Sequence, residues 1–249
     1  MSFIRALYSS DNFLLYLYLN HFWKPKKNTL EAFLYHFSKD KKDFTVLQIG
    51  ANDGLINDPI CKLIRKGQWQ GVLIEPQKLV FDTYLKPLYK NYSKIKLYNQ
   101  AIGKQNATEK LYVISFSAAR WATGLASFVR SSIEGKITDG YVVKCIRKYN
   151  EKAPASTDAY IATQEVDCVT FDHIFTSSAL SKIDLLQIDT EGFDFEIIKM
   201  FPFDKMKPAL ISFESERLSV EDMKACEVYL KKMGYNVSPI ERDSVAVLM

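Results

Sequence analysis

The feature that most constrains the fold is a regular alternation of short apolar runs with helical segments over residues 44–102. Phe44–Gly50 and Gly71–Pro76 are β-branched apolar runs that end in turn residues, as is typical of buried strands. A third strand is expected over Lys94–Ile102, and the segments between the three runs have helical spacing. Three strands alternating with two helices predict a parallel sheet with helices on both faces.

The second half of the chain repeats this pattern. Strands are expected over Ile183–Asp189 and Ala209–Glu214, and helices follow them over Phe195–Met200 and Val220–Lys232. The end differs, because two extended runs flank a short polar segment and predict an antiparallel hairpin, Tyr235–Ile240 with Val245–Leu248. The predicted fold class is α/β, a doubly wound and mostly parallel sheet with a C-terminal antiparallel hairpin.

The chain divides into three kinds of segment. Residues 1–40 are rich in aromatic side chains and are expected to form a helical N-terminal extension, and residues 41–249 form the main domain. Residues 103–165 interrupt that domain without a strand–helix–strand pattern. A connection of this length is usually functional or mobile, so we expect a lid or a substrate loop, with disorder as the alternative.

Composition narrows the class of protein. The chain is 47% hydrophobic and 25% charged, which is the balance of a soluble globular protein, and no window approaches the length of a membrane span. Arg5 and Asp11 interrupt the start, which argues against a signal peptide. Four widely spaced cysteines indicate reduced thiols in a cytoplasmic protein. The lysine pairs are interrupted by acids and lack interleaved aromatics, so no nucleic-acid partner is expected, whereas a homo-oligomer is compatible.

Unusual residues follow four of the expected strands, where an open parallel sheet binds its ligands. They are the glycine-rich turn Gly50–Gly54, Glu75, the segment Asp189–Gly192, and Glu214. A glycine turn lets backbone approach a ligand closely, and its N–H groups can donate to a carboxylate or a phosphate. An acid at the next strand end can accept both hydroxyls of a ribose, so the pair suits a cofactor that carries a nucleoside.

The turn also distinguishes between such cofactors. It lacks the second and third glycines of the dinucleotide fingerprint, so a nicotinamide-dependent oxidoreductase is a disfavoured rival. S-Adenosylmethionine carries no phosphate and suits a shorter turn. The alternatives left open are that Gly50 and Gly54 only form a tight turn and that Glu75 is only a solvated strand end.

Four segments resemble FkbM-type methyltransferases, which are S-adenosylmethionine-dependent enzymes that O-methylate sugars and natural products. The resemblance covers about residues 44–216 and is carried by VLQIGANDG at Val46–Gly54, VLIEP at Val72–Pro76, VDCVTFD at Val166–Asp172 and DLLQIDTEGFD at Asp184–Asp194. It implies the class I methyltransferase fold, a Rossmann-like sheet that ends in an antiparallel hairpin. Many members of this family carry Asp where this chain has Gln48.

The resemblance also implies residue roles. Gly50, Asn52 and Asp53 would hold the methionine end of the cofactor, and Glu75 would hold the ribose. Ala101 and Ile102 would surround the adenine, with a place in the strand core as their alternative.

Methyl transfer to an alcohol needs a base or a metal, because the alcohol pKa lies far above seven. The histidines do not fall at expected strand ends, so the carboxylates Asp189, Glu191 and Glu214 are the candidates, in that order. They could act as base, orient the acceptor or hold a divalent cation. The alternatives are that Glu191 caps the following helix and that Glu214 forms an ion pair with Arg217.

Arg120 and Trp121 in the insertion could grip and stack a sugar ring, although a tryptophan is more often a core residue. The sequence therefore predicts an S-adenosylmethionine-dependent O-methyltransferase that acts on a saccharide or a sugar-bearing metabolite. The alternative is a non-catalytic module that keeps the nucleoside pocket and binds a glycan or a partner protein.

Overall fold

A computed structural model describes residues 3–10 and 12–249, so Asp11, which supported the argument against a signal peptide, lies outside the described residues. A seven-stranded sheet forms the centre of the fold, in the order β3-β2-β1-β7-β8-β10-β9. The strands are β1 (Thr45–Ile49), β2 (Gln70–Ile74), β3 (Ile95–Tyr98), β7 (Leu185–Ile188), β8 (Leu210–Glu214), β9 (Tyr235–Ile240) and β10 (Asp243–Leu248). The first five in spatial order run parallel, and β10 is antiparallel to both of its neighbours. The predicted mostly parallel α/β sheet with a C-terminal hairpin is confirmed.

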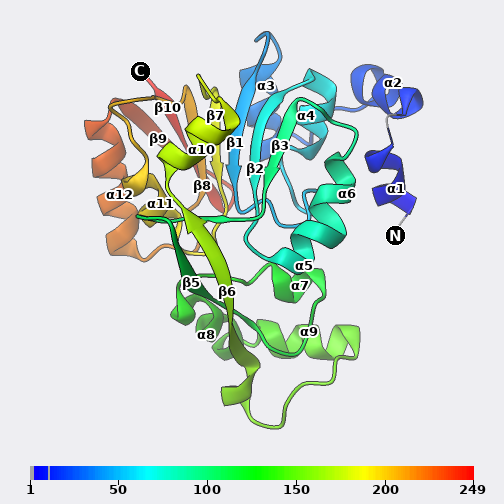
Figure 1. Ribbon diagram of the computed structural model, residues 1–249, viewed down its shortest axis with the longest axis vertical. Coiled ribbons are helices and arrows are strands. Elements are labelled where there is room, and N and C mark those ends of the chain that lie inside the picture. The colour runs from blue at the N-terminus through cyan, green and yellow to red at the C-terminus, as the bar shows by residue number, and fades with distance from the viewer. Residues whose placement is uncertain (1–2, 11) are drawn as a thin grey trace.

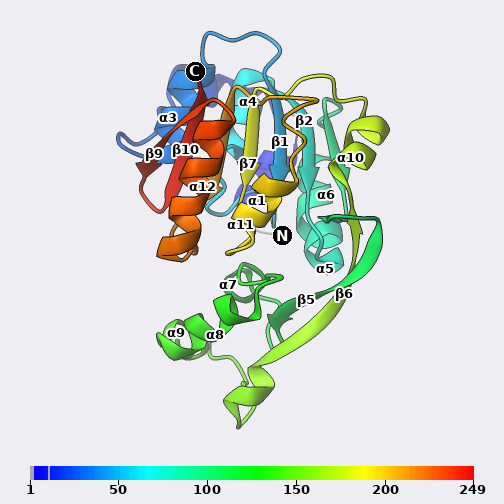
Figure 2. The same cartoon turned by 90° about the vertical axis from the view of Figure 1, so that its left-hand side faces the viewer.

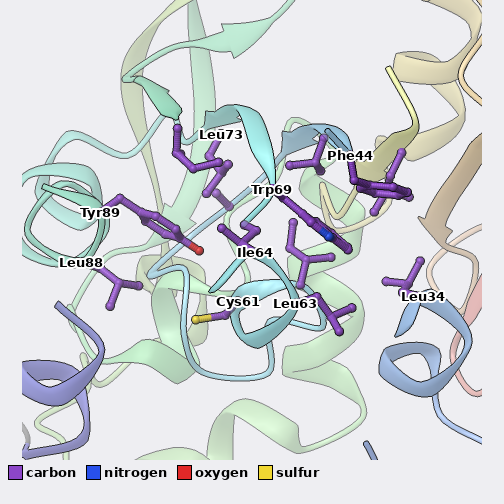
Figure 3. Close-up of a cluster of buried hydrophobic side chains, with 14 of the residues drawn as sticks. Leu34, Phe44, Cys61, Leu63, Ile64, Trp69, Leu73, Leu88 and Tyr89 are labelled. Carbon is purple, nitrogen blue, oxygen red and sulfur yellow. The ribbon is translucent and has the colours of Figure 1, made fainter. Parts of the chain in front are cut away.

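Helices cover both faces of this sheet (Figures 1 and 2). One face packs against the N-terminal helices and those that follow β1 and β2: α1 (Phe3–Ser9), α2 (Phe13–His21), α3 (Leu30–Ser38), α4 (Cys61–Gly67), α5 (Lys78–Val80), a π-helical turn η1 (Phe81–Leu85) and α6 (Lys86–Tyr89). The other face packs against α10 (Phe171–Ser178), α11 (Asp194–Met200) and α12 (Val220–Lys232). Figure 3 shows part of the first core, in which Trp69, Phe44 and Leu73 pack beside α4. Among the described helices, none has both the length and the hydropathy of a membrane crossing.

Alternation within the strands separates the two cores. Val46 and Leu185 belong to the first core, whereas Leu47 and Leu186, one residue later on the same strands, belong to the second. Successive side chains of a strand point to opposite faces, so continuous apolar runs are needed where both faces are covered. This is why the parallel strands are apolar throughout and could be found from sequence.

The third predicted strand is shorter than expected. β3 ends at Tyr98, and Ala101–Ile102 forms a separate strand, β4, that pairs with β6 in a second sheet. Asn99 lies at the break, and its side-chain amide donates to the carbonyls of Glu75 and Pro76 at 2.9 and 3.0 Å. Beyond the last paired residue of β3, this side chain thus contacts the backbone that follows β2.

Residues 103–165 are an ordered lobe beyond the carboxyl ends of the parallel strands (Figures 1 and 2). The second sheet has the order β4-β6-β5, and its long strands β5 (Ala107–Ile114) and β6 (Ile161–Val169) run antiparallel. Between them lie α7 (Arg120–Thr123), α8 (Arg130–Thr138), α9 (Tyr141–Tyr149) and a 3₁₀ turn, η2 (Thr157–Tyr160). Buried residues such as Trp121, Ile133 and Val142 give the lobe its own core. The division of the chain at residue 40 and the lid role of the lobe stay predictions.

A buried arginine joins the N-terminal helices to the main domain. Arg65 of α4 is 2% exposed, and its guanidinium donates to the carbonyls of Tyr8, Cys61 and Leu88 at 2.9–3.3 Å. Its charge also lies 4.9–5.2 Å from the centres of three tyrosine rings, those of Tyr8, Tyr89 and Tyr92. A buried cation needs such partners, because burial without them is very costly.

We expect Arg65→Met to lower the free energy of unfolding by at least about 2 kcal/mol, because two or more buried carbonyls lose their donor. Urea denaturation followed by circular dichroism measures this loss. The control is Lys42→Met at an exposed position, which should change stability by less than about 0.5 kcal/mol. Equal stabilities of the two variants would show that Arg65 does not fasten α1 to the domain.

Candidate active site

A cavity lies at the carboxyl ends of the parallel strands, between the strand ends and the lobe. Eight residues predicted from sequence line it: Gly50, Asn52, Glu75, Ala101, Ile102, Arg120, Asp189 and Glu191. Three others, Asp53, Trp121 and Glu214, do not appear in its lining. The fold therefore brings most of the predicted residues to one cavity, as expected at the switch point of a doubly wound sheet.

Gly50 brings the ends of β1 and β7 into contact. Its backbone has φ +81°, and a Cβ atom there would lie 1.8 Å from the carbonyl oxygen of Asp189. Only glycine fits this approach without displacing backbone. The predicted tight turn is thus real, and it fixes the position of Asp189 relative to the turn.

The turn does not present free N–H groups, contrary to the expectation that it would donate them to a ligand. The backbone N–H groups of Gly50 and Ala51 donate to Ile74, and those of Leu55 and Ile56 donate to the Asp53 carboxylate. The N–H groups between them also have internal acceptors. The turn therefore offers close approach and the Asn52 side chain rather than an amide cradle.

Glu75 stands at the end of β2 and is 2% exposed. Its carboxylate accepts from the backbone N–H of Asn52 and of Gln77, both at 2.8 Å, and from the Gln77 side chain at 3.2 Å. Burial raises the pKa of Glu75 to about 7, against the opposing effect of these hydrogen bonds. The carboxylate thus links the glycine turn to the β2 end and still lines the cavity.

Asp53 is engaged by other parts of the protein. Its carboxylate pairs with Arg5 of α1 at 2.7 Å and accepts from two backbone N–H groups of the turn. These contacts fasten the turn to the N-terminal extension and leave Asp53 out of the cavity lining. Contact with the methionine end of a cofactor stays a prediction for Asp53.

The lobe contributes Arg120 but not Trp121. Arg120 lines the cavity beside the turn, with its Nε 3.8 Å from Asp53 Oδ1. Trp121 is 7% exposed, packs in the lobe core and directs its indole N–H to Glu151 at 3.4 Å. The suggested stacking of Trp121 on a sugar ring is therefore corrected to a core role.

Sequence reasoning missed several lining residues. Gln100 lies between β3 and β4, and its buried Oε1 has no hydrogen-bond partner. Phe128 of the lobe and Phe193 after β7 face each other with ring centres 5.3 Å apart and line the cavity together. Gln100 could have been found as a polar residue next to Ala101, whereas no local pattern marks Phe128.

Three carboxylates gather at the ends of β7 and β8. Oxygens of Asp189, Glu191 and Glu214 lie within 4.8 Å of one another. Arg217 pairs with Glu191 at 2.8 Å and lies 3.7 Å from Glu214, whose other oxygen is 3.9 Å from Arg242. Burial, followed by repulsion from Glu191 and Asp189, raises the pKa of Glu214 to about 10. Burial raises the pKa values of Asp189 and Glu191 as well.

Asp194 is a further acid that sequence reasoning did not single out. It is fully buried at the start of α11, and it accepts from the Thr190 hydroxyl at 2.9 Å and from the Glu214 N–H at 3.1 Å. It also accepts from the N–H groups of Thr190 and Gly192, which lie before the helix. The N-cap residue of α11 is Phe193, and no side chain caps this helix, so the capping role considered for Glu191 is not observed. Burial raises its pKa to about 7. Asp194 thereby joins the ends of β7 and β8 beneath the carboxylate cluster.

The cluster has the chemistry of a divalent cation site. Glu214 is only 1% exposed, and neither of its carboxylate oxygens accepts a hydrogen bond. Carboxylate oxygens are the ligands that Mg²⁺ and Mn²⁺ prefer, and a bound cation would give the Glu214 oxygens the partner that they lack. Asp189, Glu191 and Glu214 are the residues that would hold it.

One family model and several solved structures are similar to this chain. The model of the methyltransferase FkbM domain matches residues 48–237. No curated protein sequence matches the chain significantly. Similar solved structures include a precorrin-6y C5,15-methyltransferase from Geobacter metallireducens, with 10% identity and a TM-score of 0.44 over 92% of this chain and 94% of that one. A methyltransferase from Pyrococcus furiosus has 11% identity and a TM-score of 0.38 over 98% of this chain and 96% of its own.

The matched residues contain the glycine turn, Glu75, the whole lobe and the carboxylate cluster. They cover well over half of the chain and include the segments that carried the resemblance in sequence, apart from Val46 and Leu47. The chain belongs to the FkbM methyltransferase domain family.

Proposed function

We propose that the protein is an S-adenosylmethionine-dependent O-methyltransferase that transfers a methyl group to a hydroxyl of a saccharide or a sugar-bearing metabolite. The observation that carries this proposal is one cavity that holds both Glu75, suited to a ribose, and Asp189, suited to an acceptor hydroxyl. Membership of the methyltransferase family supports the reaction class. The saccharide rests on the family resemblance.

Different lining residues of the cavity suit the adenine and the methionine carboxylate of this cofactor. Ala101 and Ile102 line it beside Glu75 and provide apolar surface for an adenine. Arg120 and Asn52 lie at the turn, where Arg120 offers a positive charge to the carboxylate of the methionine. When bound, S-adenosylmethionine supplies a methyl group already activated on a sulfonium sulfur.

Asp189 is the proposed base. It is partly exposed at the end of β7, and burial raises its pKa, so the carboxylate is a better proton acceptor than an ordinary aspartate. Glu191 is held by Arg217, and Glu214 lies deeper in the protein. Asp189 therefore takes the hydroxyl proton, while the other two set the electrostatic surroundings.

A cation at the three carboxylates is the second mechanism, and the unsatisfied oxygens of Glu214 favour it. A divalent cation would lower the pKa of a coordinated hydroxyl. In that case Asp189 is a ligand rather than the base, and metal removal distinguishes the two mechanisms.

We also propose a cellular compartment and a test that distinguishes an enzyme from a binding module. Four buried and unpaired cysteines favour a reducing compartment, so we place the protein in the cytoplasm. A non-catalytic module would bind the cofactor without producing S-adenosylhomocysteine, which product analysis detects.

We expect Glu75→Ala to weaken S-adenosylhomocysteine binding by at least about 1 kcal/mol, roughly fivefold, because the ribose hydroxyls lose their acceptor. Calorimetry measures the dissociation constant. Since the Glu75 pKa is about 7, its ionised fraction grows as the pH rises through that value. Affinity should therefore increase from about pH 6 to about pH 8 in the wild type and stay flat in Glu75→Gln. Wild-type affinity in both variants would remove Glu75 from the cofactor site.

We expect Asp189→Asn to reduce turnover by about 10²–10⁴-fold, because the carboxamide cannot take the proton, while S-adenosylhomocysteine affinity changes little. S-Adenosylhomocysteine release in the presence of a pool of candidate sugars measures turnover. The matched control is Asp204→Asn at an exposed position, which should keep full activity. An active Asp189→Asn enzyme would contradict the proposed proton transfer.

We expect the wild type to bind Mn²⁺ in an electron paramagnetic resonance titration if the cluster is a metal site, and Glu214→Gln to lose that binding at least tenfold. Glu221→Gln, an exposed change on α12, serves as the control. Activity lost in EDTA and restored by Mg²⁺ would favour the metal mechanism. Full activity in EDTA, with no Mn²⁺ signal, would leave Asp189 as the base.

A further inference from the structure

A second cleft shares Asp189 with the cofactor cavity. Its walls come from the segment that leads into α3, from the loop between β1 and α4, and from the hairpin turn between β9 and β10. Each wall contributes a charged residue to the lining: Lys26, Asp58 and Arg242, respectively. Asp189 lines both this cleft and the cofactor cavity. A group in the cleft can therefore reach the carboxylate that faces the cofactor.

One lining residue of the cleft, Gln187, belongs to a polar row in an otherwise apolar face of the sheet. Val46, Leu185 and Leu210 pair in register across β1, β7 and β8 and belong to the apolar core. Two residues further along each strand, on the same face, stand Gln48, Gln187 and Ser212, which also pair in register. Of these, Gln187 lines the cleft. The change from apolar to polar thus occurs where the strands approach Asp189.

The side-chain oxygens of these three residues lack hydrogen-bond partners. Gln48, Gln187 and Ser212 are at most 3% exposed, and the side-chain oxygen of each is buried without a hydrogen bond. The amide nitrogen of Gln48, in contrast, donates to Asp58 in the cleft wall at 3.0 Å. A buried polar atom left unpaired costs about 1–3 kcal/mol, so three of them side by side indicate a ligand or water that supplies donors.

The charges of the cleft indicate which ligand. The lining contains five acids and three bases, and two of the bases are already engaged: Lys62 pairs with Glu31 at 3.1 Å, and Arg242 lies 3.9 Å from Glu214. An anionic group would find no surplus of basic side chains in this lining. Amide and carboxylate oxygens instead accept from hydroxyl groups, which a neutral polyol supplies in number.

We propose that this cleft binds the methyl acceptor and that the acceptor is a neutral, hydroxyl-rich molecule, a sugar ring without phosphate or carboxylate. One hydroxyl donates to Gln187, and another lies against Asp189. This inference rests on the proposed function, since it assumes that the cofactor occupies the other cavity. It narrows the substrate to uncharged saccharides and assigns the N-terminal extension and the hairpin turn to acceptor recognition.

Saturation-transfer NMR on the full chain, saturated with S-adenosylhomocysteine, tests the inference. The probes are methyl α-glucoside and methyl α-rhamnoside as neutral sugars, and glucose 6-phosphate and glucuronate as their charged counterparts. We expect transfer to a neutral glycoside and at least tenfold weaker transfer to both charged sugars. Stronger binding of the charged sugars, or no transfer to any glycoside, would overturn the inference.

The variant Gln187→Leu tests the role of Gln187 in the cleft. It removes an unpartnered polar atom, so the fold should be retained or stabilised. We expect at least a tenfold loss of glycoside binding with unchanged S-adenosylhomocysteine affinity. The matched control is Gln70→Leu. Gln70 is the first residue of β2, at the amino ends of the parallel strands and away from the cleft, so this variant should bind the glycoside like the wild type. Equal glycoside binding by Gln187→Leu and the wild type would reject the cleft.

The cofactor measurement separates the two proposals. If S-adenosylhomocysteine fails to bind the folded wild type, the proposed function itself fails. If S-adenosylhomocysteine binds normally and the Gln187→Leu variant binds the glycosides as well as the wild type does, only the proposal for the acceptor cleft is wrong.

Discussion

The close contact between Gly50 and the carbonyl of Asp189 is the constraint on which the site depends. β1 lies between β2 and β7, so its end is the point where the chain order of the sheet reverses. The turn after β1 reaches Glu75 on one side through the Asn52 N–H and abuts Asp189 on the other. One backbone approach therefore sets the spacing between the residue proposed for the ribose and the residue proposed for the acceptor hydroxyl.

Charge is concentrated where the fold can least easily solvate it. Asp194 and Glu214 are almost fully buried, and Asp189 and Glu191 stand beside them. Arg217 and Arg242 come from the segment after β8 and from the hairpin turn, so the antiparallel end of the sheet supplies the countercharges. Asp194 is satisfied by hydrogen bonds, whereas Glu214 is not. An unsatisfied buried acid above a satisfied one is expected of a functional site rather than of a structural one.

The sequence was sufficient for features that repeat locally. The strands could be found because both faces of a parallel sheet are covered, and the carboxylates followed from their place at strand ends. It was not sufficient for contacts between distant segments. No sequence pattern near Asp53 predicts that its carboxylate pairs with Arg5, which lies 48 residues earlier. Trp121 and Phe128 lie in a lobe of short helices whose packing no strand or helix period reveals, so one was assigned to the ligand and the other was missed.

The parts of the site also divide along the family boundary. The cofactor cavity and the carboxylate cluster lie within residues 48–237, which match the FkbM methyltransferase domain. Two walls of the second cleft, Lys26–Glu31 and Glu241–Asp243, lie outside that range, and the Glu241 carboxylate joins them by accepting from the Leu30 N–H at 3.0 Å. The cavity proposed for the methyl donor thus lies inside the matched range, whereas the cleft proposed for the acceptor includes residues on both sides of it. Arg5 of α1 pairs with Asp53 of the glycine turn, and Arg65 of α4 donates to the Tyr8 carbonyl of α1. These contacts connect the N-terminal extension, which supplies one wall of the cleft, to the turn that borders the cofactor cavity.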